Sequence, residues 1–209
     1  MYKTSLYFAC VFMAVCMSLS SCAKQKSLNH VDDLAFWGST PEEAGRMLGV
    51  DFSKTEPEEK QLGDLYGKSY GLPDRYPIGE NMAKLEFFFL DNETPAGNPL
   101  GLGVVFLYFE EGTDLKEIWQ ELAELYELQG EPSCDLREDG TVRSFQWWSQ
   151  TQADESRQAA LRETVEEMFG TASPYGGPDF SIWGSVKQDG TVLVYVLGTS
   201  GAVQKQLVS

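Results

Sequence analysis

Apolar residues recur at helical spacing in three segments of the chain. In residues 113–128, large apolar side chains return every three or four positions and acidic residues fill the other face. Residues 40–48 begin with Thr-Pro-Glu-Glu, a sequence typical of a capping box, and are followed by Gly49, which can end a helix. A third segment covers about residues 155–169. The pattern therefore predicts three helices.

Extended apolar runs follow these helices in pairs. The pairs are residues 84–91 with 103–110, 134–137 with 141–150, and 180–186 with 192–197. Asp139-Gly140 and Asp189-Gly190 join the two later pairs, and Asp-Gly is a strong hairpin signal because both residues tolerate positive φ. Both turns continue with Thr-Val, which indicates a repeated helix–hairpin unit or convergent turn chemistry.

The order of these segments predicts the fold class. We expect an α+β fold in which about three helices pack on a mainly antiparallel sheet of about six strands, built from three helix–hairpin units. Residues 50–83 would be an insertion that enlarges the first unit.

Several of the expected strands are apolar on both faces. One face should pack on the helices, and the insertion over residues 50–83, a partner or a ligand should meet the other. Trp147 and Trp148 are adjacent, so one should lie in the core and the other on the far face. Together with Trp183, they form the candidate binding surface, which could stack on a sugar ring or a protein. Packing under a loop is the alternative interpretation.

The first 22 residues differ from the rest of the chain. Residues 1–21 carry Lys3 near their start, followed by an apolar stretch. This stretch is shorter than a membrane span, which needs about 20 residues. Such a segment is typical of a signal peptide. It ends in Leu19-Ser20-Ser21-Cys22, which resembles the lipobox of bacterial lipoproteins. The resemblance implies that Cys22 carries the lipid, including palmitate-type acyl chains, and becomes the mature N-terminus. A chance Cys after a signal peptide, or a signal anchor that is never cleaved, is the other interpretation.

This interpretation divides the chain into three parts. Residues 1–21 are the signal peptide, residues 22–34 the lipidated Cys22 with a polar tether, and residues 35–209 a single α+β domain. The protein would then be extracytoplasmic, attached by lipid to the cell membrane or to an outer membrane where there is one. Of the four cysteines, only Cys134 would remain in the domain. We expect its thiol to be buried, because free Cys packs as a small hydrophobe.

Charge and composition exclude several functions. With 16 Lys and Arg against 32 Asp and Glu, the net charge is −16, which opposes nucleic-acid binding. The one histidine, His30, falls in the tether, so a catalytic His or a His-rich metal site in the domain is excluded. The sequence carries no nucleotide-binding or serine-hydrolase motif. We expect no catalytic residue, metal or cofactor, although the abundant carboxylates leave an acid-residue hydrolase of envelope glycans as an alternative.

A second resemblance concerns the first helix. Residues 38–43 read Gly-Ser-Thr-Pro-Glu-Glu, and the segment ends at Leu48-Gly49. This resembles the helix–hairpin modules of the small lipoprotein of the bacterial outer-membrane barrel-assembly machine and of the secreted β-lactamase-inhibitor protein. Both are binding proteins, which implies an interaction role. The leading hypothesis is a non-enzymatic lipoprotein that binds an envelope protein or polymer. Capture of a small solute is a weaker hypothesis, because the chain is short for a binding protein with two lobes and a cleft between them.

Overall fold

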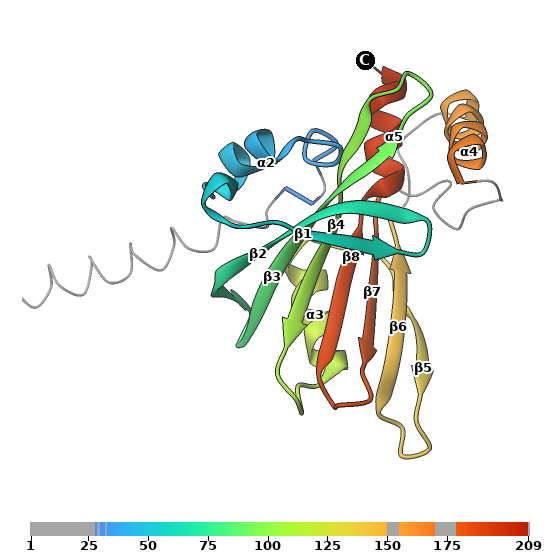
Figure 1. The fold of residues 1–209 in the computed structure, drawn as a ribbon. Helices are drawn as coiled ribbons and strands as arrows, with labels where there is room; N and C mark the ends of the chain where they lie inside the picture. Colours follow the sequence, from blue (N-terminus) through green and yellow to red (C-terminus); the bar gives the residue numbers. More distant parts are fainter. Residues whose placement is uncertain (1–27, 29, 32, 150–154, 170–178, 209) are drawn as a thin grey trace, which may run out of the picture.

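The computed structural model describes residues 28, 30, 31, 33–149, 155–169 and 179–208. They form an α+β fold with one antiparallel eight-stranded sheet and four α-helices, two more strands and one more helix than the pattern predicted (Figure 1). The helices are α2 (Pro41–Leu48), α3 (Leu115–Leu125), α4 (Glu155–Phe169) and α5 (Thr199–Val208), with a short 3-10 helix, η2 (Phe52–Lys54). The strands are β1 (Glu58–Leu62), β2 (Leu65–Ile78), β3 (Asn81–Glu93), β4 (Pro99–Phe109), β5 (Ser133–Leu136), β6 (Val142–Trp148), β7 (Ser181–Val186) and β8 (Val192–Leu197).

The three predicted hairpins lie side by side in the sheet. Its order is β1-β2-β3-β4-β8-β7-β6-β5, and a helix precedes each of the hairpins β3–β4, β5–β6 and β7–β8 in the chain. The two Asp-Gly turns also share their hydrogen bonds. Asp139 Oδ1 accepts from the backbone nitrogen and hydroxyl of Thr141 at 2.9 and 2.7 Å, and Asp189 accepts from Thr191 at 3.0 and 2.6 Å. The glycines between them have φ of 82° and 84°, as these turns require.

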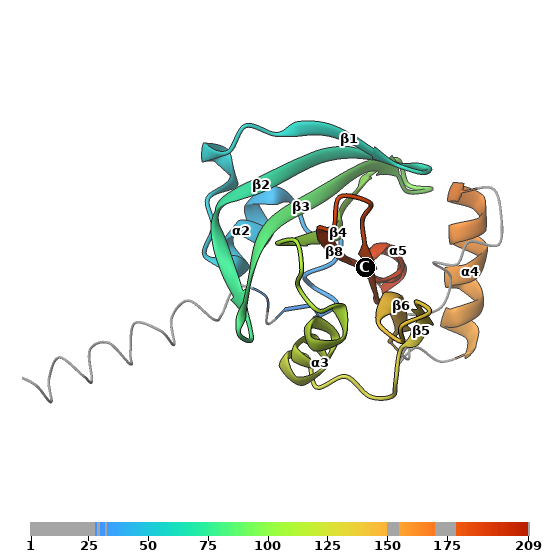
Figure 2. The same ribbon diagram turned by 90° about the horizontal axis from the view of Figure 1, so that it is seen from below.

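Helix α3 and the short helix η2 cover one face of the sheet, which we call the core face. Helix α3 packs its apolar side on it, with Trp119 against Phe145 and Trp147. Phe52 of η2 lies on the aromatic rings of β3, and α5 packs on β4. Both views place α3 behind the sheet and the β1–β2 hairpin in front of it (Figure 2). Helix α4 departs from the prediction, because it packs mainly on α5 and not on the sheet.

The predicted insertion is part of the sheet. Residues 50–83 contain η2, β1 and β2, and β2 pairs with β3 to extend the sheet beyond the first hairpin. The pattern did not predict these strands because β1 reads Glu-Glu-Lys-Gln-Leu and β2 contains Pro73. Pro73 falls where the β2–β3 register shifts between Gly71 and Arg75, and an irregular position is one of the few places where a strand tolerates proline.

The segment predicted to be a tether packs into the domain at its end. Leu28 and Val31 are buried, and the Trp37 indole donates a 2.7 Å hydrogen bond to the Val31 carbonyl. The His30 ring lies 6.4 Å from that of Phe36. Packing against the domain therefore extends back to residue 28, inside the segment predicted to be a tether. The predicted signal peptide and Cys22 lie outside the described residues; within the described ones, no helix is both long enough and apolar enough to cross a membrane.

Candidate functional site

A row of aromatic side chains crosses the sheet on the face opposite the core face. Phe106 of β4 is paired with Tyr195 of β8, which is paired in turn with Trp183 of β7. Residues paired directly across antiparallel strands share a face, so these three rings lie in one row. Trp148 of β6 and Tyr108 of β4 extend it. We call these five residues the aromatic face.

The rings of the aromatic face contact one another without a break. The centroids of Trp148 and Trp183 are 6.4 Å apart with planes at 79°, an edge-on contact. Trp183 and Tyr195 stack at 6.0 Å, and Tyr195 lies 6.2 Å from Phe106. Phe106 and Tyr108 stack at 6.2 Å. Such spacing is in the favourable range for aromatic pairs, so neighbouring rings stabilise one another's positions.

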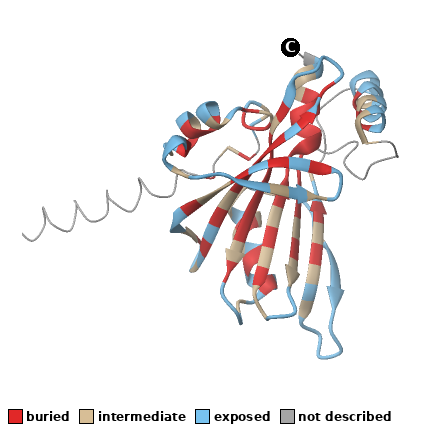
Figure 3. Cartoon of the chain, viewed as in Figure 1, coloured by how far each residue is buried: buried red, intermediate tan, exposed pale blue. Residues whose placement is uncertain are grey.

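The aromatic face is open at one end and covered at the other. Trp148 is 42 % exposed, whereas Phe106 is only 3 % exposed. Trp183 and Tyr195, which lie between them, are half-buried, and so is Tyr108 beyond Phe106. Figure 3 shows the same change, from intermediate and exposed positions on β6 and β7 to buried ones on β4. The sequence left open whether this face is covered or free. In the structure, the face is covered at Phe106 and exposed at Trp148.

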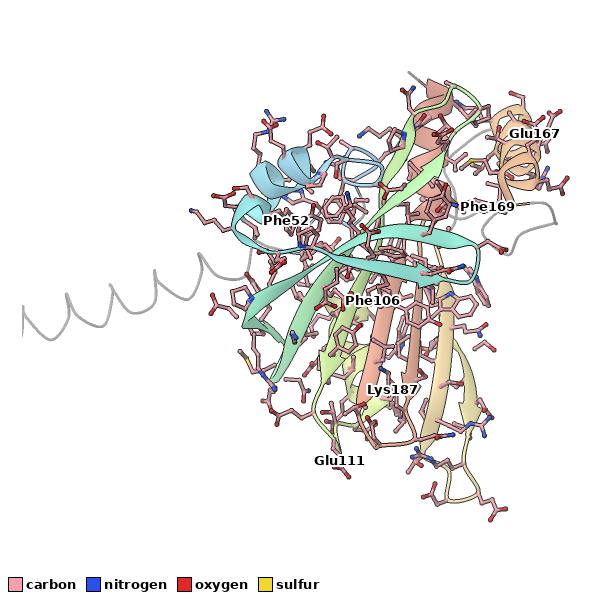
Figure 4. The ribbon with its side chains drawn as sticks, in the orientation of Figure 1. Phe52, Phe106, Glu111, Glu167, Phe169 and Lys187 are labelled. Carbon is pink, nitrogen blue, oxygen red and sulfur yellow. The ribbon has the colours of Figure 1, made fainter. Side chains whose placement is uncertain are left out.

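The cover is supplied by β1, which crosses the sheet in front of β4 (Figure 1). The ammonium of Lys60 lies 4.0 Å from the centroid of Phe106, a cation–π contact. The same ammonium forms an ion pair with Glu86 of β3 and donates to the Tyr108 hydroxyl at 3.3 Å. Tyr108 in turn donates to Glu86 Oε2 at 2.9 Å. We call Lys60, Glu86 and Tyr108 the latch. Figure 4 shows Phe106 beneath the crossing strands.

The latch holds Glu86 as a carboxylate. Burial acts to raise the pKa of Glu86, but the hydrogen bonds from Lys60, Tyr108 and Ser69 together outweigh it, so its pKa lies below the ordinary value. Burial, and then the hydrogen bond donated to Glu86, raises the pKa of Tyr108 well above its usual range. At neutral pH the latch is therefore a charged pair with a protonated tyrosine. This arrangement holds β1 on the sheet.

Neutralising the latch should destabilise the fold in a pH-dependent way. Because the folded-state pKa of Glu86 is lowered, its charge contributes stability above the unfolded pKa of about 4.3, and that contribution is lost as the pH falls through the folded pKa. We expect Glu86→Gln to lower the free energy of unfolding by about 2 kcal/mol at pH 7. At about pH 3 the difference from the wild type should shrink. Urea unfolding at both pH values measures it.

The control for this prediction is Glu93→Gln, at an exposed position of the same strand. It should leave the free energy of unfolding within about 0.5 kcal/mol of the wild type. If Glu86→Gln cost the same at both pH values, the loss would come from packing and not from the charge.

The structure separates the three tryptophans of the candidate surface. Trp148 and Trp183 meet on the aromatic face. Trp147 is 7 % exposed on the core face, where its indole donates to the Gln129 carbonyl at 3.1 Å, so it takes no part in this surface. Tyr195 and Phe106 were missed because only the strand register brings them beside Trp183. Their alternation with other apolar residues gave no sign of which face was open.

Cys134 is a correction to the sequence prediction. Its thiol was expected to be buried, but the residue is exposed. It lies on β5, the last strand of the sheet, and all four residues of that strand are exposed. Burial would need a layer over this end of the sheet, whereas α3 packs mainly on β6 and β7.

Comparisons with known proteins identify no relative of this chain. No protein-family model, curated protein or solved structure matches the chain. Among the described residues, no group of three or more His, Cys, Asp or Glu side chains is placed to hold a metal ion. The case for a function therefore depends on the aromatic face and on the resemblance of the N-terminus to a lipobox.

Proposed function

We propose that this chain is a lipid-anchored extracytoplasmic binding protein, and that its aromatic face takes up a component of the cell envelope without catalysis. The observation that carries the proposal is the unbroken row of rings, which begins at the exposed Trp148 and ends under β1. Soluble domains rarely leave rings of this size grouped on a surface unless the group has a partner.

A glycan is the ligand class that fits this surface best. Sugar rings present flat apolar faces that stack on aromatic side chains and hydroxyls that need hydrogen-bonding partners between them. The aromatic face offers both. Gln146 is paired with Trp183 in the register, and Ser144 with Ser185, which places half-buried polar groups among the rings. Lys187, whose ammonium is 5.3 Å from the Tyr108 ring, adds a cation at the edge.

The proposed anchor would keep this surface near the membrane. Only residues 23–27 separate Cys22 from the buried Leu28. A chain of that length reaches at most about 20 Å when fully extended. Lipid on Cys22 would therefore hold the domain close to the headgroups, where a ligand must also be present.

Loss of the Trp148 and Trp183 rings should weaken ligand binding without unfolding the domain. The test uses the full chain in detergent, mixed with insoluble cell-wall glycan and sedimented. We expect the wild type to co-sediment and Trp148→Ala with Trp183→Ala to bind at least about tenfold more weakly, because two stacking contacts are lost. The matched control is Leu207→Ala on α5, whose side chain is 41 % exposed and should not affect binding.

Each result of this experiment separates the interpretations. Failure of the wild type to sediment with the glycan contradicts the ligand class. If the wild type instead binds an envelope protein that the double variant does not bind, the aromatic face is still the binding surface, but its ligand is a protein. Equal binding by wild type and double variant contradicts the proposed role of the aromatic face.

A further inference from the structure

The sheet has two edges, and they differ in chemistry. Within the described part of the chain, β1 is the first strand of the sheet and β5 the last. An edge strand presents unpaired backbone groups, which proteins usually protect with charges. β1 has this protection, since it reads Glu-Glu-Lys-Gln-Leu. β5 reads Ser-Cys-Asp-Leu, and its one charge, on Asp135, is neutralised by Arg143 at 2.6 Å.

A groove runs beside the β5 edge, on the side of the sheet that carries α3. Its volume is about 600 Å³. Trp119 and Ala123 of α3 form one wall, and Leu136 and Val142 of the β5–β6 hairpin form the other. Leu136 is 57 % exposed at the rim, more than any other large apolar residue that the structure describes.

The charge of the groove indicates what fits it. The chain carries a net charge of −16, but the lining of the groove holds one cation, Lys116, and one anion, Glu131. The neighbouring edge is balanced as well, by Asp135 and Arg143. A neutral surface with apolar walls is complementary to an uncharged apolar segment. It is a poor match for a second copy of this acidic chain.

A groove between a helix and a sheet edge of low charge, although this edge is only four residues long and irregular between Asp135 and Leu136, has the geometry of β-strand addition. In that mode, the backbone of an extended peptide continues the sheet, and every second side chain enters the adjoining groove. We propose that β5 receives an extended, uncharged segment of a partner protein, with apolar side chains at alternate positions directed between α3 and the β5–β6 hairpin. This site is on the opposite face from the aromatic face and does not depend on the proposed function.

The test starts from peptides and the full chain in detergent. Random twelve-residue peptides displayed on phage are selected on the protein, and the enriched peptides are synthesised. We expect alternating apolar residues in them, and slower amide hydrogen exchange over Ser133–Leu136 when they are bound. Methylating alternate backbone nitrogens of a peptide should weaken binding at least tenfold, because strand addition uses the backbone while simple apolar contact does not.

Variants locate the site. Leu136→Lys adds a charge to the edge, and Ala123→Trp fills the groove; each should weaken peptide binding at least tenfold. Gln61→Lys makes the same change of charge on the β1 edge and should leave binding unchanged. The proposal is overturned if no peptide is enriched, if binding survives Leu136→Lys, or if protection appears elsewhere. Self-association that Leu136→Lys abolishes, without peptide binding, would make a second copy the occupant and would also overturn it.

Discussion

Replacing Trp37 with alanine should lower the free energy of unfolding by about 4 kcal/mol, because a large and fully buried side chain would be removed. Trp37 is 1 % exposed and packs edge-on against Phe36 at 5.1 Å. Its indole also fills the space above Gly198, where an added Cβ would lie only 1.8 Å from the ring. The residue thus joins the N-terminal segment to the start of α5. A cavity there would weaken both attachments.

The measurement is urea unfolding followed by circular dichroism. Trp37→Phe is the matched control, since it keeps an aromatic ring but loses the hydrogen bond to the Val31 carbonyl. It should cost about 1–2 kcal/mol, well below the alanine variant. If Trp37→Ala unfolded at the same urea concentration as the wild type, residues 28–37 would not be part of the cooperative domain.

Removing the proposed lipid site should move the protein from the membrane to the soluble fraction. Each buried CH₂ of an acyl chain contributes about 0.8 kcal/mol, so two or more chains bind a bilayer stably. The rest of the chain offers little to replace them. Beyond Cys22 it carries 15 Lys and Arg against 32 Asp and Glu, and anionic headgroups repel this negative charge. We therefore expect Cys22→Ala to be almost entirely soluble, while the wild type remains with membranes.

Cell fractionation and metabolic labelling with a fatty acid measure this result. Cys134→Ala is the matched control, because it removes the one exposed free cysteine of the domain and leaves Cys22 in place. It should stay membrane-bound and keep its label. A Cys22→Ala protein that remains with membranes would contradict the lipoprotein assignment and favour an uncleaved signal anchor.

The sequence predicted those elements whose signals are local. Helix α4 has the bounds that its apolar spacing indicated, and the Asp139 and Asp189 turns form as their chemistry requires. Helix α5 was missed, because it begins with Thr-Ser-Gly and shows no apolar stripe. Its burial comes from packing on β4 and α4, which depends on residues distant in the chain.

For the candidate site too, local patterns could be predicted from the sequence, whereas contacts between distant residues could not. Alternation along a strand was sufficient to expect that Trp147 and Trp148 point to opposite faces, but not to say which of them is exposed. That depends on α3, which covers Trp147, and on the register that pairs Ser181 with Trp148 and Tyr195 with Trp183. The latch was beyond prediction, since Lys60, Glu86 and Tyr108 come from three strands, one of them unexpected.

The central claim is that the aromatic face contacts an envelope component in the cell, and site-specific photo-cross-linking tests it most directly. A photoreactive phenylalanine analogue is placed at Trp148 in one strain and at Leu207 in another, two positions of nearly equal exposure, 42 % and 41 %. After illumination of living cells, we predict a discrete adduct with glycan or protein from position 148 and none from position 207. Equal adducts from both positions, or none from position 148, would contradict the claim.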